Sequence, residues 1–212
     1  MGEKYRQRTA LAHRGLAVRA LGATDADAGA VAGVVLGECG LRGQTALRGD
    51  AGDPAFVDAA RQAIGSAPPT EPNTVAGPAD LAVGPRALWL GPDEWLVVDG
   101  GGEALAALRA ALDGRHAAVV DVSDSRAVIA LSGPRAREVL AKGCALDLHP
   151  RVFAPGRCAQ TLLAKAHVIL HQIDDAPSYE IYVHRSFADY LWTWLEDAAA
   201  EYGIAVRGGL GQ

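Results

Sequence analysis

The segment Arg126-Ala-Val-Ile-Ala-Leu-Ser-Gly-Pro-Arg-Ala-Arg-Glu-Val-Leu-Ala-Lys-Gly143 decides the fold, because its hydrophobic periodicity changes within a few residues. Arg126–Leu131 is a short apolar run typical of a buried strand. Ser132-Gly-Pro134 suits the start of a helix. The apolar residues that follow have helical spacing, and they are Ala136, Val139 and Leu140. The segment therefore predicts a strand followed at once by a short helix that ends at Gly143.

The remainder of the C-terminal half has strands and a closing helix. Ala159–Leu163, Val168–Gln172 and Tyr179–Val183 are predicted as three strands with polar connections. A helix is predicted from about Ser186 to Tyr202. Its apolar residues at three- and four-residue spacings are Phe187, Tyr190, Leu191, Trp194 and Leu195.

The N-terminal half begins with a similar order of elements. Gly15–Leu21 is predicted as a strand and Thr24–Leu36 as a helix that ends at Gly37. A second helix follows, with Asp53 as its cap, Pro54 in its first turn and Gly65 as its stop. Its apolar face is expected to hold Phe56, Val57, Ala60 and Ile64.

A loop and a hairpin complete this half. The prolines of Ser66–Asn73 exclude regular structure there. Ala87–Leu90 and Trp95–Val98 flank Gly91-Pro-Asp-Glu94, which predicts a β-hairpin with a four-residue turn. A helix is expected from near Glu103, and it carries Leu105, Leu108 and Leu112 on one side.

The two halves look like diverged copies of one strand-helix-strands-helix unit. Leu16–Gly22 resembles Ala127–Gly133, although chance similarity between short apolar strands is an alternative. We expect an α+β fold of two similar halves with antiparallel sheets. The predicted divisions are an N-terminal extension at 1–15, a first half at 16–113, a second half at 114–206 and a C-terminal tail at 207–212.

Composition narrows the class of protein. The chain has 212 residues, of which 50% are apolar and 21% charged, and this is ordinary for a globular protein. A net charge of −5 argues against nucleic-acid binding, which needs a basic face. No apolar run is long enough for a membrane span or a signal-peptide core, so we expect no membrane partner and a cytoplasmic location. Cys39, Cys144 and Cys158 are expected to be buried and reduced.

The residues that could carry chemistry have few of the contexts that chemistry needs. Asp121-Val-Ser-Asp-Ser-Arg126 is the densest polar cluster, but no nucleophile elbow surrounds its serines. We expect a turn held by aspartate and serine hydrogen bonds, with Arg126 as an ion-pair partner. A small hydrolase that uses Ser123 or Ser125 with His149 is a competing hypothesis.

Histidines could indicate a metal site, and tryptophans a partner surface. His167 and His171 would lie on one side of a strand but roughly 13 Å apart, too far to share an ion. Trp192 and Trp194 cannot both face one core from a single helix. An exposed Trp192 would indicate a partner surface, because aromatic residues are enriched at interfaces.

Four segments together resemble the gamma subunit of heterotetrameric sarcosine oxidase, over a region from about Leu16 to Tyr202. They are Leu90-Gly-Pro-Asp-Glu-Trp-Leu-Val97, Val122-Ser-Asp-Ser-Arg126, Leu131-Ser-Gly-Pro-Arg-Ala-Arg-Glu-Val-Leu140 and Tyr179-Glu-Ile-Tyr-Val-His-Arg-Ser-Phe187. The segment Leu131–Leu140, with Asp147-Leu148 and Pro155-Gly156, is also similar to the folate-binding fold of the aminomethyltransferase of glycine cleavage. This wider similarity implies the fold only.

The resemblance implies a structural subunit without a site of its own. Active aminomethyltransferases carry an acidic residue after the hairpin that corresponds to Ala159–Gln172, where this chain has Val168-Ile-Leu-His-Gln172. No catalytic, cofactor-binding or metal-binding residue is assigned to this chain. An autonomous folate-binding protein that holds a pterin through Glu180 or Asp121 is the main alternative.

For the whole complex, the resemblance implies oxidative demethylation of sarcosine to glycine, with O2 consumed, H2O2 produced and tetrahydrofolate accepting the one-carbon unit. FAD, FMN, NAD and the folate site would belong to the alpha and beta subunits, and zinc to a small delta subunit. This chain would contact mainly the alpha subunit.

Overall fold

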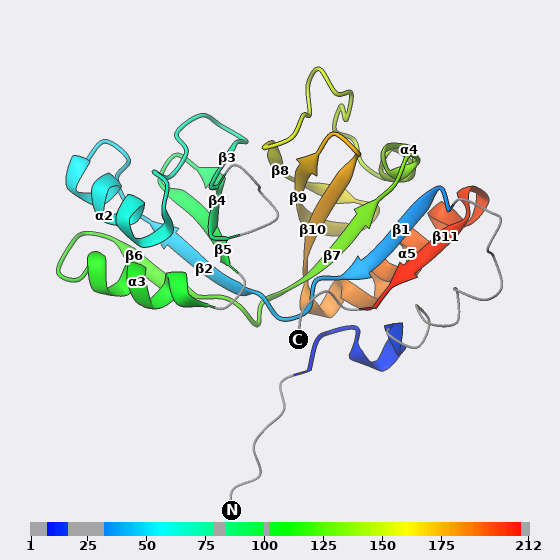
Figure 1. The fold of residues 1–212 in the computed structure, drawn as a ribbon, viewed down its shortest axis with the longest axis horizontal. Helices are drawn as coiled ribbons and strands as arrows, with labels where there is room; N and C mark the ends of the chain where they lie inside the picture. Colours follow the sequence, from blue (N-terminus) through cyan, green and yellow to red (C-terminus); the bar gives the residue numbers. More distant parts are fainter. Residues whose placement is uncertain (1–7, 17–31, 79–83, 100–101, 209–212) are drawn as a thin grey trace, which may run out of the picture.

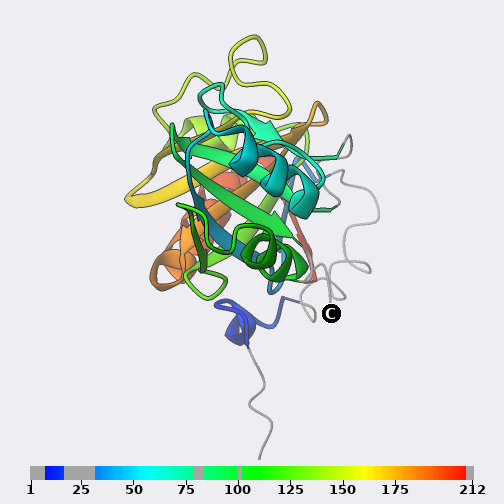
Figure 2. The same cartoon turned by 90° about the vertical axis from the view of Figure 1, so that its left-hand side faces the viewer.

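The computed structural model describes residues 8–16, 32–78, 84–99 and 102–208. Two β-sheets pack face to face, and each carries helices on its outer face, so the described part of the chain forms four layers (Figure 1). Figure 2 views the molecule from the side of α2 and α3, which lie in front of the five-stranded sheet. The predicted α+β class with antiparallel sheets is confirmed.

The six-stranded sheet has the strand order β11-β1-β7-β10-β9-β8. Its neighbouring strands are antiparallel except for the parallel pair β1 and β11. The bounds are β1 Val34–Glu38, β7 Arg126–Ser132, β8 Cys158–Leu163, β9 Ala166–Asp174, β10 Ser178–His184 and β11 Ile204–Arg207.

The five-stranded sheet has the order β3-β4-β5-β2-β6, and all its pairs are antiparallel. The bounds are β2 Gly43–Arg48, β3 Val75–Ala76, β4 Arg86–Gly91, β5 Glu94–Asp99 and β6 Ala118–Asp121. The predicted hairpin is therefore confirmed as β4 and β5. Its strands are longer than expected, which leaves only Pro92 and Asp93 in the turn.

The helices cover the outer faces of the two sheets. Helices α2 and α3 pack on the five-stranded sheet, and α4 and α5 pack on the six-stranded sheet. Their bounds are α2 Pro54–Ile64, α3 Glu103–Ala111, α4 Ala136–Ala141 and α5 Ala188–Ala199, with short 3-10 turns η1 Ala12–Arg14, η2 Arg185–Phe187 and η3 Ala200–Tyr202.

Helices α2 and α4 lie where capping residues and glycines in the sequence predicted them. The Asp53 carboxylate accepts the Ala55 N–H at 2.9 Å, and Gly65 ends α2 in the left-handed conformation, as predicted. Between β7 and α4, Gly133 has a φ of +112°. A Cβ atom there would lie 2.7 Å from the Gly33 carbonyl oxygen, so the close approach of these two backbones requires glycine.

The core between the two sheets consists of strand residues. Leu88 and Leu96 of the five-stranded sheet pack against Val128, Ile169 and other residues of the six-stranded sheet. Because side chains alternate across a strand, every second residue of β4, β9 and β10 points into this inter-sheet layer. Polar residues at these positions are consequently removed from water and brought together from distant parts of the chain.

One expected helix is wrong in part. Thr24–Leu36 was predicted as helix, but Val34–Leu36 belongs to strand β1, which pairs with β7 and β11. Backbone pairing on both sides of β1 overrides the helical preference of an apolar run that also suits a buried strand. The expected strand Gly15–Leu21, its similarity to Ala127–Gly133 and the start of that helix fall mainly on residues 17–31, outside the described residues.

Two strands pair outside the half of the chain in which they lie. β1 comes from the first half but joins the six-stranded sheet, and β6 comes from the second half but pairs with β2 in the five-stranded sheet. The sheets therefore exchange strands across the boundary at residues 113 and 114. The domain division itself stays a prediction.

Of Trp192 and Trp194, which were expected not to face one core together, Trp192 is the buried one, so it does not indicate a partner surface. Its side chain is 0% exposed, whereas Trp194 is partly buried and its ring lies against Gly143. The stripe of α5 that faces the sheet consists of Ala188, Leu191, Trp192, Leu195, Ala198 and Ala199. Phe187 and Tyr190, which also have helical apolar spacing, are 45% and 38% exposed. Two overlapping stripes have helical spacing in this segment, and packing on the six-stranded sheet selects between them.

Candidate functional site

A buried charged cluster lies in the inter-sheet layer, and we call it the Glu180 cluster: Glu180, Arg86, Tyr182, His171 and Arg42. Glu180 and Tyr182 are two residues apart on β10 and so lie on the same face, and His171 on β9 lies opposite Glu180. Arg86 begins β4 in the other sheet, on the same face as Leu88. Arg86 and Glu180, which are 94 residues apart in the chain, thus come from two different sheets.

The carboxylate of Glu180 is the centre of the cluster. Arg86 Nη2 forms an ion pair with Glu180 Oε2, and the Tyr182 hydroxyl donates to the same oxygen at 2.5 Å. Arg42 Nη2 lies 3.4 Å from Oε1. Glu180 is only 5% exposed and Arg86 is 0% exposed. A charge this deep needs a partner of opposite charge, and Arg86 supplies it.

The surroundings of Glu180 favour its charged form. Burial alone would raise the pKa of this carboxyl, but the neighbouring His171, the positive charges of Arg86 and Arg42 and the Tyr182 hydrogen bond together hold it well below the usual range. We attribute the lowering chiefly to the arginines. His171 Nδ1 lies 3.8 Å from Oε2, and burial lowers the pKa of His171, which leaves the imidazole neutral at neutral pH.

The neutral, buried His171 should make stability depend on pH. Its pKa in the folded chain is below the ordinary 6.5, so between those two values the unfolded chain binds more protons. Stability should therefore fall as the pH drops below about 6.5, by at most about 1.4 kcal/mol per pH unit for this group. The His171→Gln variant should lose this part of the slope in urea unfolding measured from about pH 7.5 to about pH 5.

The matched control is His167→Gln, which removes an exposed imidazole from the same face of the same strand. Its loss of slope should be smaller than that of His171→Gln, because it removes no buried group. An unchanged slope in His171→Gln would contradict the assignment of a neutral, buried imidazole. Glu180 acts in a different window, because its lowered pKa keeps its contribution intact until the pH falls below about 4.5.

The predicted turn at 121–126 is confirmed in its serine and aspartate contacts. The Ser123 hydroxyl donates to Asp121 Oδ1 at 2.6 Å, and the Ser125 hydroxyl donates to the Val122 carbonyl at 2.7 Å. The backbone N–H of Ser123 donates to the same oxygen at 3.0 Å, and the two hydrogen bonds lower the pKa of the Asp121 carboxyl. The ion pair expected of Arg126 is not formed with any described carboxylate within 4.0 Å, and its guanidinium instead contacts Ser125 Oγ at 3.3 Å.

The hydrolase hypothesis finds no support in this geometry. The Nδ1 atom of His149 accepts the backbone N–H of Arg151, and among described residues neither serine has a histidine as hydrogen-bond partner. His171 is fully buried, whereas His167 on the same strand is exposed.

The cysteines are buried and free, as predicted. Burial raises the pKa of the Cys158 thiol to about 12 and that of Cys39 to about 11, so neither is a ready nucleophile. Within the described ranges no three histidine, cysteine or acidic side chains gather as metal ligands. No described helix has the length and apolar character of a membrane span.

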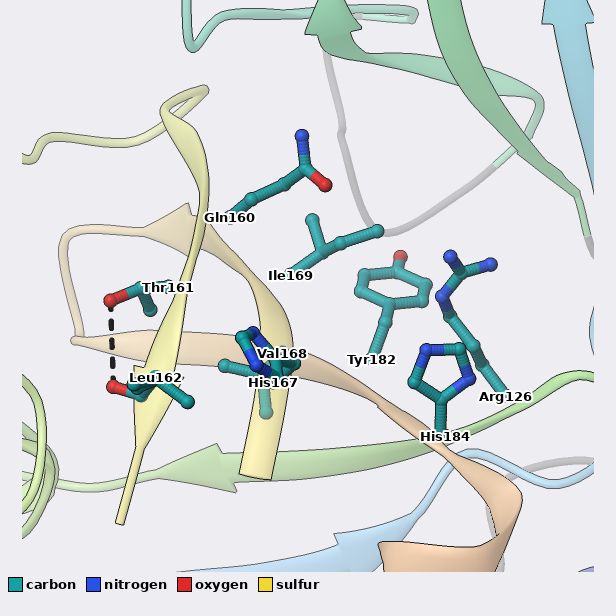
Figure 3. A pocket seen from close by; sticks show the side chains of 9 residues that line it. All are labelled: Arg126, Gln160, Thr161, Leu162, His167, Val168, Ile169, Tyr182 and His184. Carbon is teal, nitrogen blue, oxygen red and sulfur yellow. Dashed lines mark hydrogen bonds between the residues drawn. The ribbon is translucent and has the colours of Figure 1, made fainter. Parts of the chain in front are cut away.

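A groove of about 320 Å³ opens beside the cluster, over the strands β7 to β10 (Figure 3). Tyr182 and Ile169 form its floor, and Arg126 and His184 stand together at one end. Gln160 borders it on β8 and donates to the Leu90 carbonyl at the tip of the other sheet. The groove therefore lies where the five-stranded sheet stops covering the six-stranded one.

Of the candidate residues in the sequence, Asp121, Ser123 and Ser125 share one turn, whereas Glu180 lies in the inter-sheet layer and His149 is hydrogen-bonded within its own loop. Arg86 was not among the predicted residues. Its place at the start of an otherwise apolar strand was the available signal. An arginine that begins an otherwise apolar run, Arg86-Ala-Leu-Trp-Leu90, is expected to be either at the surface or paired with a buried acid.

Comparisons with known proteins agree with this architecture. Residues 48–201 match the sarcosine oxidase, gamma subunit family. The sarcosine oxidase subunit gamma of Arthrobacter sp. is 39% identical over 179 residues, covering 82% of this chain and 84% of the relative.

Solved structures give the same result. A chain of the heterotetrameric sarcosine oxidase from Corynebacterium sp. U-96, in complex with pyrrole 2-carboxylate, has a TM-score of 0.79 and 35% identity and covers 92% of this chain and 96% of that one. The aminomethyltransferase T of the Bartonella henselae glycine cleavage system has a TM-score of 0.60 at 18% identity, over 84% of this chain and 48% of that one. This second likeness shows the fold alone. On the match to its family and relatives, the chain belongs to the sarcosine oxidase gamma subunit family.

Proposed function

We propose that this chain is a non-catalytic assembly subunit of a heterotetrameric sarcosine oxidase. The observation that carries the proposal is the likeness, over nearly the full length of both chains, to a chain of the Corynebacterium sp. U-96 heterotetramer. The function of such a subunit would be to present a folded surface to its neighbours.

The state of Glu180 supports the non-catalytic part. The alternative folate-binding function needs a carboxylate that can accept hydrogen bonds from a pterin. Glu180 is instead closed off by Arg86 and Tyr182, and Asp121 is engaged by Ser123 in a turn. Glu180 is therefore not presented to a ligand, and Asp121, although exposed, does not line the groove, so the alternative is the weaker candidate.

The complex that we propose would oxidatively demethylate sarcosine to glycine with O2, in sarcosine catabolism in the cytoplasm. It would release H2O2 and 5,10-methylenetetrahydrofolate. The flavins FAD and FMN, NAD, tetrahydrofolate and zinc would be held by the alpha, beta and delta subunits, with alpha as the main partner of this chain. The acidic balance of the chain, at a net charge of −5, is consistent with the absence of a nucleic-acid partner.

Co-expression tests the proposal. The chain should copurify with the other subunits at a fixed stoichiometry in size-exclusion chromatography, and the complex should consume O2 when sarcosine is added. The isolated chain should not bind tetrahydrofolate in calorimetric titration. Failure to assemble, or micromolar folate binding by the isolated chain, would contradict it and favour the autonomous folate-binding protein.

A further inference from the structure

We propose that the groove over β7 to β10 is the docking site for an extended, acidic segment of another subunit. This inference rests on the proposed function, since it requires a partner chain. The groove holds ionisable and apolar side chains in an order that the strand register sets. That order defines the chemistry of the segment that would fit.

Four side chains form a single row across four strands, and we call it the groove row: Leu162, His167, His184 and Arg126. Leu162 lies opposite His167, and His184 lies opposite Arg126. The register of β9 with β10 runs to Val168 and Val183, so the next position places His167 opposite His184. All four residues border the groove.

The row carries one permanent positive charge and two ionisable rings side by side, and none of the described residues that line the groove is a carboxylate. Like charges directly opposite one another on neighbouring strands are unfavourable. Arg126 is half-buried, and burial lowers its pKa, which is the mark of a guanidinium with little solvation. Glu94 acts on Arg126 only at longer range, because no described carboxylate lies within 4.0 Å of the guanidinium. An incoming carboxylate would supply a direct ion pair at this end.

The opposite end of the row is apolar. Leu162 on β8 is 48% exposed. Ile169, on the floor of the groove, lies two residues along β9 from His167, the partner of Leu162. A large apolar side chain of the occupant would cover Leu162 and bury surface that is now open to water. The occupant therefore combines an acidic residue at the Arg126 end with an apolar residue at the Leu162 end.

The length of the row favours a peptide over a small anion. Three strand spacings of about 4.8 Å give about 14 Å, which is the span of about four residues of extended chain. A single small carboxylate would contact Arg126 and leave Leu162 exposed. An extended segment that crosses the strands can satisfy both ends at once.

The test uses the assembled complex and the affinity of this chain for the remaining subunits. Arg126→Glu should weaken binding on the order of 10²-fold, mainly through faster dissociation, because it opposes the segment's carboxylate at close range. Leu162→Asp should weaken it by about 10-fold. Arg61→Glu is the matched control, as it reverses an exposed arginine on α2, on the outer face of the other sheet.

Each variant must retain the unfolding transition of the wild-type chain, so that a loss of affinity reports the groove. A photoreactive Leu162→p-benzoylphenylalanine variant provides a second measurement in the purified complex. Crosslinking to a partner peptide that contains aspartate or glutamate supports the proposal. Crosslinks only within this chain, or to a peptide without an acid, overturn it.

The outcomes separate the two proposals. If the unmodified chain does not assemble, the proposed function fails and the docking site fails with it. If the wild-type complex forms but Arg126→Glu and Leu162→Asp bind as tightly as Arg61→Glu, only the docking site fails. Binding of acetate or citrate at the groove, together with unchanged subunit affinity, would identify a small-anion site and also overturn the proposal.

Discussion

The Arg86→Met variant is expected to lose about 3–5 kcal/mol of unfolding free energy, because it leaves the buried Glu180 carboxylate without its main counter-charge. Arg86 is 0% exposed, and its Nη2 atom contacts both Glu180 and the Tyr182 hydroxyl. Methionine fills much of the space of the arginine stem but supplies no charge. Urea unfolding of the purified chain at neutral pH measures the loss.

A second substitution distinguishes loss of the charge from loss of packing. The double variant Arg86→Met and Glu180→Gln should be more stable than Arg86→Met alone, because glutamine removes the uncompensated charge. Arg48→Met is the control, since Arg48 pairs with Asp93 at 2.8 Å but is 54% exposed. Its expected effect is much smaller than that of Arg86→Met, because both charges of this pair are exposed to water. A double variant no more stable than Arg86→Met would argue against a charge-driven cluster.

The Trp192→Ala variant is expected to lose about 3–5 kcal/mol, through lost apolar burial and the cavity left behind. Trp192 is among the largest fully buried side chains, at the interface of α5 with the six-stranded sheet. The loss should appear as a lower urea midpoint with little change in the slope of the transition, because the fold itself is retained.

The control for this prediction lies on the same helix. Tyr190 is 38% exposed and touches Phe187 edge to face, with the ring centroids 6.4 Å apart. Tyr190→Ala should destabilise by no more than about 1.5 kcal/mol. Equal losses in the two variants would mean that α5 is rotated from the orientation described above.

Elements with their own local signals could be predicted from the sequence. Asp53, Pro54 and Gly65 mark both ends of α2 by capping chemistry that depends only on neighbouring residues. Prolines likewise excluded regular structure from the loop before β3. The start of β1 was missed because an apolar run that suits a helix also suits a strand, and only pairing with β7 decides.

The candidate site could be predicted only in part. Glu180 could be identified from the sequence as a candidate carboxylate in a strand. Its ion pair with Arg86 could not, because Arg86 comes from the other sheet. The groove row could not be predicted from the sequence. Alternation of side chains along a strand can be read from the sequence, but the order of the strands in the sheet cannot. Leu162, His167, His184 and Arg126 become neighbours only when β8, β9, β10 and β7 lie side by side.

Family membership, the α+β composition and most helices and strands are therefore properties of the sequence, because motifs, capping residues and periodicity act over a few residues. The tertiary structure decided which face of α5 is buried, which sheet receives β1 and which cation neutralises Glu180. The physical reason is that burial and ion pairing join residues that are distant in the chain. Arg86 and Glu180 meet only because two sheets pack face to face and exclude water between them.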